Sequence, residues 1–331
     1  MGDHDALFKR VFAVPANAAG MLRSVLPAEL VAALDLSRLE LLSGESISDD
    51  LDEQRADLLF RAPLLERDED GDEEHVYLPL HLLTEHQSTP PPRMPLRALR
   101  YVLPVWLQAL SDDPTLKKLP PVVVLVVYHG LSKWSGPRSL HDMVAGLERF
   151  PVLRDYVPNL TLLIDDLSSL GDSALRARPL TPVPMTAMWL LRDSRHMDAL
   201  IAHLPVFRDV LEQLVRESPD EALFFLRYLS FTATEDSYRE FRRAIIEHIP
   251  AAEDPMATMA EVLKQEGRQE GRQEGQQETL REVLRLWITQ RFGPLNAAHE
   301  AWIATATPSD LRSAVERVAL APDVNAVFPP H

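Results

Sequence analysis

Residues 122–128, near the middle of the chain, form an unbroken apolar run in which five of the seven residues are valine. Branched side chains favour strands, and a strand that is apolar on both faces is typical of a sheet covered by helices on both sides. Gly130 ends the run. The run is too short to cross a membrane, which needs roughly 20 residues. We therefore expect a buried central strand in an α/β fold.

Neighbouring patterns predict that residues 1–175 form a mixed central sheet flanked by helices. The pattern predicts further strands at residues 37–42, 56–62, 76–87 and 160–164, with helices within 3–33 and at 94–110 and 140–148. The strands at 56–62 and 76–87 form an expected pair, because Asp70-Gly71 between them is a turn signal. Residues 176–262 carry successive amphipathic stripes, which indicates an all-helical region.

A Glu-Gly-Arg-Gln repeat between residues 266 and 277 marks a linker, which we place at residues 263–279. Each glycine costs a helix about 1 kcal/mol relative to alanine. The glutamates recur every four residues, which brings like charges together on a helix. We expect a solvated helical or frayed linker; the alternative is a helix whose glycine face admits a second chain. Residues 280–331 then form a small helical module, in which Leu284, Trp287 and Ile288 would support a homo-oligomer.

The 331 residues include no cysteine, which excludes disulfide frameworks, zinc ribbons, iron–sulfur clusters and thiol catalysis. A metal ion could be held only by carboxylate, carbonyl or imidazole groups. The acidic first residues lead into no apolar stretch, so we expect a cytoplasmic protein with no signal peptide and no membrane segment.

The net charge of −16 is distributed unevenly along the chain. Residues 45–74 contain 13 acidic and 3 basic residues, whereas residues 86–111 contain no acid and carry Arg93, Arg97 and Arg100. Binding of a phosphate-bearing partner depends on the local charge rather than on the total. The composition is therefore compatible with DNA as a partner.

Two carboxylates on neighbouring expected strands are candidate metal ligands. Strand side chains alternate, so Glu85 and Gln87 share a face, and a hairpin would bring Asp57 within reach of Glu85. Like charges among leucines are costly unless a cation neutralises them, and oxygen ligands suit Mg2+ or, alternatively, Mn2+. The backbone carbonyl of His86 would supply another oxygen. The alternative is that these acids are simply solvated at strand ends.

The layout of an aspartate, 27 intervening residues and then Glu-x-Gln resembles a PD-(D/E)XK nuclease site with glutamine in place of the lysine. Five short sequence segments sharpen the resemblance. They are HDALFK at 4–9, RADLLF at 55–60, LTEHQS at 83–88, RALRY at 97–101 and VVYHG at 126–130. Together they resemble the Rpn family of recombination-promoting nucleases, also described as YhgA-like putative transposases. The resemblance is strong over residues 3–170 and extends through the helical middle to the repeat.

This resemblance implies a restriction-endonuclease-like core and Mg2+-dependent cleavage of DNA that promotes recombination or the activity of a mobile element. Asp57, Glu85 and the His86 carbonyl would bind the metal. Gln87 would orient the water or a phosphate oxygen, but an uncharged amide cannot act as a base. Asp5 is either a supporting acid of this site or the cap of the first helix.

Arg93, Arg97 and Arg100 have the spacing of one helix stripe. They would contact DNA phosphates, or they pair with the acidic segment 66–74. His129 is interpreted as a structural residue, with substrate contact as the alternative. Two rival functions keep the same fold: a DNA- or partner-binding protein with weakened catalysis, and a nuclease acting on RNA.

Overall fold

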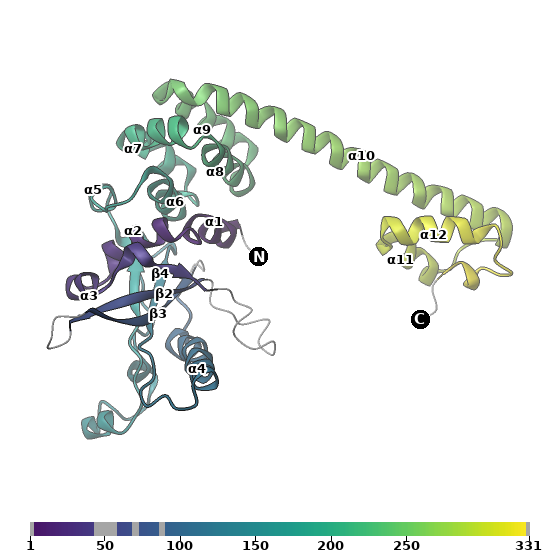
Figure 1. Ribbon diagram of the computed structural model, residues 1–331. Helices are drawn as coiled ribbons and strands as arrows, with labels where there is room; N and C mark the ends of the chain where they lie inside the picture. The colour runs from purple at the N-terminus through teal and green to yellow at the C-terminus, as the bar shows by residue number, and fades with distance from the viewer. Residues whose placement is uncertain (1–2, 43–57, 68–72, 86–89, 329–331) are drawn as a thin grey trace. The chain divides into compact units, whose positions relative to one another are not determined.

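The structure is a computed structural model that describes residues 3–42, 58–67, 73–85 and 90–328 (Figure 1). The chain divides into two compact units, Met1–Met256 and Ala257–His331, which are described separately. The first unit is a mixed α/β unit with one sheet and many helices, and the second is helical. The expected four-part division of the chain remains a prediction.

The sheet has five strands in the order β1-β2-β3-β4-β5. They are β1 (Glu40–Leu41), β2 (Leu58–Arg67), β3 (Glu73–Glu85), β4 (Val123–Tyr128) and β5 (Leu163–Asp166). The first three strands are antiparallel neighbours, whereas β3, β4 and β5 run parallel to one another. The expected strand pair is confirmed, and so is the burial of the apolar strand, which lies between β3 and β5.

Helices cover both sides of the sheet. The helices α1 (Asp3–Phe12) and α2 (Pro15–Val25) lie on one side, and α4 (Met94–Asp112) lies on the other (Figure 1). Five consecutive residues of β4, from Val124 to Tyr128, are buried, and α4 packs Ala98 and Val102 against this strand. The apolar run therefore forms a strand that is covered on both faces, as its composition predicts.

Three expected elements differ from the structure. The expected helix at 140–148 is only the short η4 (Leu140–Met143), because Ser139 and Asp142 form a capping box around it and Gly146 has a φ of +90°. The expected strand at 160–164 begins three residues later and ends two residues later, as β5. The expected strand at 37–42 is shortened to β1, because Asp35 caps a 3-10 turn, η1 (Leu36–Arg38).

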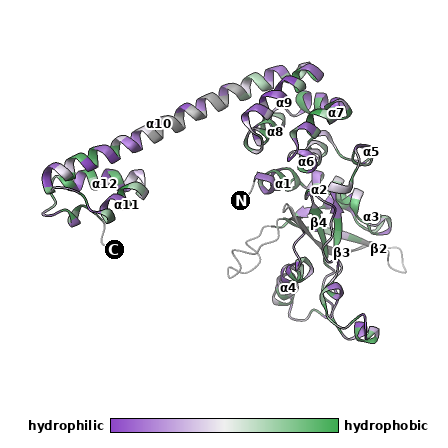
Figure 2. Cartoon of the chain, turned by 180° about the vertical axis from the view of Figure 1, so that it is seen from behind, coloured by the Kyte–Doolittle hydropathy of each residue, from purple (hydrophilic) through white to green (hydrophobic). Residues whose placement is uncertain are grey.

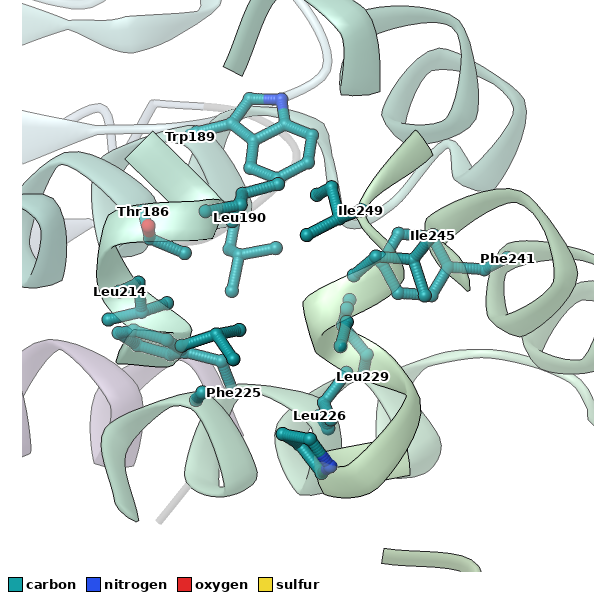
Figure 3. Close-up of a pocket in the computed structure, with 15 residues that line it drawn as sticks. Thr186, Trp189, Leu190, Leu214, Phe225, Leu226, Leu229, Phe241, Ile245 and Ile249 are labelled. Atoms are coloured by element: carbon teal, nitrogen blue, oxygen red, sulfur yellow. The ribbon is translucent and has the colours of Figure 1, made fainter. Parts of the chain in front are cut away.

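The remaining helices of the first unit are α3 (Ala28–Ala33), α5 (Asp172–Arg176), α6 (Pro182–Asp193), α7 (Met197–Glu217), α8 (Pro219–Thr232) and α9 (Glu235–His248), with the short turns η5 (Pro151–Asp155), η6 (Leu167–Ser169) and η7 (Pro250–Ala252). Of these, α6, α7, α8 and α9 pack on one another around an apolar core. Trp189 stacks on Phe207 with 4.8 Å between ring centres. Figure 3 shows the neighbouring apolar pocket, whose cavity of about 30 Å³ is close to the volume of one water molecule. This pocket is a packing space and not a ligand site.

The second unit folds around its own core. It contains most of α10 (Glu253–Phe292), then α11 (Ala297–Thr305), α12 (Pro308–Val318) and the turn η8 (Asn325–Val327). The Glu-Gly-Arg-Gln repeat is helical and lies within α10, whose middle alternates hydrophilic and near-neutral residues (Figure 2). Leu284 and Ile288 are fully buried in this core, whereas Trp287 is 44% exposed. The expectation that all three would support a homo-oligomer is therefore wrong for Leu284 and Ile288, since the unit's own helices cover them.

Among the described helices, none has a stretch long and apolar enough to cross a membrane.

Candidate active site at the carboxyl ends of the parallel strands

The carboxyl ends of β3, β4 and β5 meet at one edge of the sheet. Glu85, the last residue of β3, is in register with Tyr128, the last residue of β4. Tyr128 is in turn in register with Asp166 at the end of β5. Ligands of sheets with parallel strands bind outside the carboxyl ends of the strands. This edge is therefore the first place to look for a functional site.

In the Tyr-His-Gly segment at residues 128–130, which begins at the last residue of β4, packing requires a glycine at the third position. The Tyr128 ring folds back over the next turn and lies edge-on to Trp134, with 5.2 Å between ring centres. Any side chain at position 130 would overlap the hydroxyl and ring of Tyr128. Gly130 therefore lets the chain leave β4 closely packed on the tyrosine. His129, between the two, is buried.

Asp5 of α1 is buried and only partly paired. Its side chain reaches one cation, with 3.2 Å between Lys9 Nζ and Asp5 Oδ2, and 7% of the residue is exposed. The second oxygen, Oδ1, is buried and has no hydrogen-bond partner among the described residues. An unsatisfied buried carboxylate oxygen is costly, and such groups are concentrated at sites that bind ions or ligands. The choice between a supporting acid of a site and a helix cap therefore remains a prediction for Asp5.

A chain of hydrogen bonds holds His4, the residue before Asp5. His4 Nδ1 lies 2.5 Å from the Tyr228 hydroxyl, and this hydroxyl lies 2.8 Å from Ser194 Oγ. The His4 ring also meets the His129 ring edge-on, with 5.1 Å between centres. Burial raises the pKa of Tyr228, while the Ser194 hydrogen bond and the Arg195 charge act against this rise. The tyrosine therefore stays a neutral phenol that joins α8 and the end of α6 to the first helix and the β4 edge.

Asp165 of β5 is paired completely. Arg178 Nη2 lies 2.6 Å from Asp165 Oδ1, and Arg178 Nη1 lies 2.8 Å from Asp165 Oδ2. Both side chains are at least nine-tenths buried. A bidentate guanidinium satisfies both oxygens of a carboxylate. Asp165 is therefore a structural acid and not a free ligand.

The neighbouring Asp166 is also committed to structure. Its Oδ1 accepts hydrogen bonds from the backbone and hydroxyl of Ser168, so it caps η6. Its Oδ2 accepts one from the Trp134 backbone at 2.8 Å. Asp166 therefore fixes the turn that follows β5.

A second group of possible metal ligands lies in α5, α6 and α7. One oxygen each of Asp172 and Asp193 and one ring nitrogen of His203 lie within 4.8 Å of one another. However, Arg192 Nη2 lies 2.6 Å from both aspartates. Burial alone would lower the pKa of Arg192, but Asp193 and then Asp172 outweigh this effect and raise it. The arginine therefore pairs with both acids and offsets one of their two negative charges.

This group lines one wall of an open pocket next to the β4 edge. The pocket has a volume of about 330 Å³, and its lining includes Gly130, Ser168, Arg195 and His196 as well as the Arg192 group. Pockets of this size are within the range that binds small ligands. Its lining mixes both signs of charge, so the charge alone does not identify a ligand.

Several predicted site residues cannot be placed. Asp57, His86 and Gln87 lie outside the described residues. The backbone of Glu85 is described as the end of β3, but its side chain is not. The grouping of these residues therefore remains a prediction, with Glu85 located at the strand edge.

The three arginines predicted to bind DNA lie at the start of α4. Arg93 precedes the helix and Arg100 lies in it, and both are exposed, whereas Arg97 is partly buried. They lie on the helix that covers the sheet face opposite α1 (Figure 1). Of these three arginines, Arg93 and Arg100 are therefore the exposed ones.

Sequence reasoning assigned no role to His4, Ser194 or Tyr228. His4 lies in a segment that was singled out for its resemblance to a family, which is the one signal that could have found it. Ser194 and Tyr228 are separated from His4 by about 190 and 224 residues, and they occur in ordinary helical patterns. No local pattern indicates that they meet.

Comparison with known proteins places this arrangement in a family. The chain is 27% identical over 284 residues to "Recombination-promoting nuclease RpnA" of Escherichia coli (strain K12), which covers 80% of this chain and 84% of the relative. It is 26% identical over 260 residues to "Recombination-promoting nuclease RpnD" of Escherichia coli O157:H7, with 78% and 92% covered. No solved structure matches the chain. The family model described as "Putative transposase, YhgA-like" matches residues 2–219, and the chain therefore belongs to this family, as its sequence segments predicted.

Proposed function

We propose that this protein is a divalent-metal-dependent DNA endonuclease that hydrolyses phosphodiester bonds and so promotes recombination. The observation that carries the proposal is the buried, half-paired Asp5. Its neighbour His4 contacts His129 just past the end of β4, and the end of β4 is in register with Glu85 at the end of β3. Relatives that carry the name of recombination-promoting nuclease over most of the chain support it. We assign the core to the PD-(D/E)XK type on the basis of the Asp57, Glu85 and Gln87 spacing.

The residues present fit a hard divalent cation. Asp5 Oδ1 is a buried carboxylate oxygen that needs a positive partner, and every proposed ligand is an oxygen. Asp57, Glu85 and the His86 carbonyl would hold Mg2+, or alternatively Mn2+, with Asp5 supporting them. The ion would supply Lewis acidity to the scissile phosphate and the attacking water.

The protein's own side chains would then position the reactants. Gln87 can orient the water or a phosphate oxygen through its amide, but it cannot accept a proton as a lysine amine can. The Tyr228 hydroxyl holds His4 through Nδ1, and the His4 ring lies edge-on to His129, so its orientation next to the end of β4 is fixed. Arg93, which precedes α4, is exposed and can contact phosphates of the DNA backbone.

The glutamine at position 87 also favours a second candidate, a DNA- or partner-binding protein of the same fold with weak catalysis. A charged lysine contributes to stabilising the phosphorane-like charge in such a site, and a neutral amide contributes less. Both candidates can bind DNA, so they differ in whether the purified protein cleaves it.

The test is cleavage of supercoiled plasmid by the full-length protein with Mg2+, with Mn2+ and with a chelator. We expect metal-dependent nicking that Asp57→Ala and Glu85→Ala each abolish, while both variants still bind the DNA. Binding without nicking at any metal concentration would favour the second candidate. Undiminished nicking by both variants would refute the site, and cleavage of RNA in preference to DNA would refute the substrate.

A further inference from the structure

The helix α4 has apolar residues on two opposite faces. One face buries Met94, Ala98 and Val102 against β4 and the Trp134 region. The other face presents leucines to solvent. They are Leu96, Leu103, Leu107 and Leu110, which are 46%, 50%, 57% and 40% exposed. A helix that is apolar all round is typical of a helix that is buried on all sides.

The exposed positions of α4 follow the spacing of a helix-pairing seam. Starting at Arg93, the exposed residues fall at alternating steps of three and four. They are Arg93, Leu96, Arg100, Leu103, Leu107 and Leu110. The mean step of 3.5 residues keeps a stripe facing one partner helix along its whole length. Any helix packed on one side has this spacing on its exposed face, so what distinguishes α4 is that four of these six positions hold leucine.

Another helix of the same unit shows what a solvent-facing stripe in this protein looks like. The helix α9 buries Phe241 and Ile245 and exposes charged residues. These include Glu235, Asp236, Arg239, Glu240, Arg243 and Glu247. The exposed face of α4 therefore differs from that of α9, and a contiguous exposed apolar patch is typical of an interaction site.

We propose that α4 pairs antiparallel with α4 of a second copy of this chain. In this orientation Leu103 of one copy faces Leu107 of the other. Arg100 then lies next to the last turn of the partner helix, where terminal carbonyl groups and the exposed Asp112 attract a cation. A parallel pair would instead set Arg100 against Arg100, which like-charge repulsion disfavours.

The size of the seam sets how tightly the copies bind. A helix of 19 residues is about 28 Å long. The exposed leucines offer on the order of 400 Å² per copy, about half of the ~800 Å² that each partner of a standard interface buries. We therefore expect a reversible dimer that dissociates at micromolar concentrations, and this expectation does not depend on nuclease activity.

The main experiment measures the mass of the full-length protein by sedimentation velocity between about 1 and 100 μM. We expect a concentration-dependent dimer, and we expect Leu103→Glu and Leu107→Glu each to give a monomer with an unchanged melting temperature. Leu320→Glu is the matched control, because this leucine is 88% exposed and lies in the second unit. A wild-type monomer at the highest concentration, or a dimer that survives both α4 substitutions, would overturn the proposal. A lower melting temperature without a change in mass would overturn it too, since the leucines would then be covered within one chain.

The orientation can be tested by crosslinking, because the chain has no cysteine of its own. A mixture of the Leu103→Cys and Leu107→Cys variants should form a mixed disulfide, since facing residues of the seam are close enough to bridge. Leu96→Cys should not link to itself, since the two copies of position 96 would be about 27 Å apart along an antiparallel pair. Efficient linking of Leu96→Cys would overturn the antiparallel arrangement.

Discussion

Asp5 and Asp165 are two buried aspartates of the same unit with opposite surroundings. Asp165 has both oxygens bound by the buried guanidinium of Arg178. Asp5 has one oxygen bound by a partly exposed lysine and the other without a partner among the described residues. Burial is similar in the two cases, so the difference lies in the partner. A fully paired acid holds the fold together, whereas a half-paired acid retains capacity to bind something else.

The largest effect should follow from removing the paired acid. Asp165→Ala leaves the Arg178 guanidinium buried without its counter-charge, which typically destabilises a protein by about 3–5 kcal/mol. Urea unfolding followed by circular dichroism measures this loss. Asp209→Ala is the matched control, because Asp209 binds Arg176 at the same 2.6 Å but is 71% exposed. The control should cost less than about 1 kcal/mol; equal losses in the two variants would show that burial does not set the strength of these pairs.

The half-paired acid should behave in the opposite way. Asp5→Asn keeps the shape of the side chain and removes a buried charge, so we expect the free energy of unfolding to stay the same or rise. Under the proposed function, metal-dependent nicking should fall by about 10- to 100-fold, as is typical when a group that supports metal ligands is changed. Plasmid nicking and thermal unfolding of the same sample measure both. A large loss of stability with normal nicking would make Asp5 a second structural acid.

A smaller effect should follow from cutting the link between His4 and Ser194. Tyr228→Phe keeps the ring but removes the hydroxyl, which leaves the buried Ser194 hydroxyl and His4 Nδ1 without this partner. One buried polar group left unsatisfied costs about 1–3 kcal/mol. Thermal unfolding measures this loss of stability. The pH dependence of plasmid nicking shows whether the loss of the hydrogen bond to Tyr228 affects His4. Tyr156→Phe serves as the control, since this tyrosine is 80% exposed; equal effects would contradict the hydrogen-bonded chain.

The smallest effect concerns an exposed acid with backbone partners. Asp142 accepts hydrogen bonds from the Arg138 and Ser139 backbones, which lower its pKa below the ordinary 3.8. A lowered pKa means that the stabilisation is complete above about pH 3.8 and is lost as the pH falls through the value of the folded state. Asp142→Ala should therefore cost about 1 kcal/mol near neutral pH and nothing at strongly acidic pH. A cost that does not change with pH would show that the charged carboxylate is not the cause.

The sequence predicted the parts of the fold that depend on local patterns. The valine run specified β4, and alternation with a turn signal specified the β2–β3 pair. The expected helix at 140–148 failed because a capping box and a left-handed glycine outweigh the apolar spacing there. Asp5 was a candidate from the start because it lies in a recognisable segment. Other features depend on contacts between distant parts of the chain, so no local spacing could reveal them. They are the unpaired oxygen of Asp5, the ion pair of Asp165 with Arg178 and the hydrogen bonds that join His4, Tyr228 and Ser194.

The hydrogen bond between His4 and Tyr228 has a consequence for how the protein is made. It joins residues 224 positions apart, so a ribosome must have synthesised α8 before this bond can fix His4. A nascent chain or fragment that stops before Tyr228 contains every residue that we assign to metal binding, but it lacks the phenol that fixes His4. Timing of synthesis would thus keep the proposed cutting activity incomplete until the helical region has folded over the first helix.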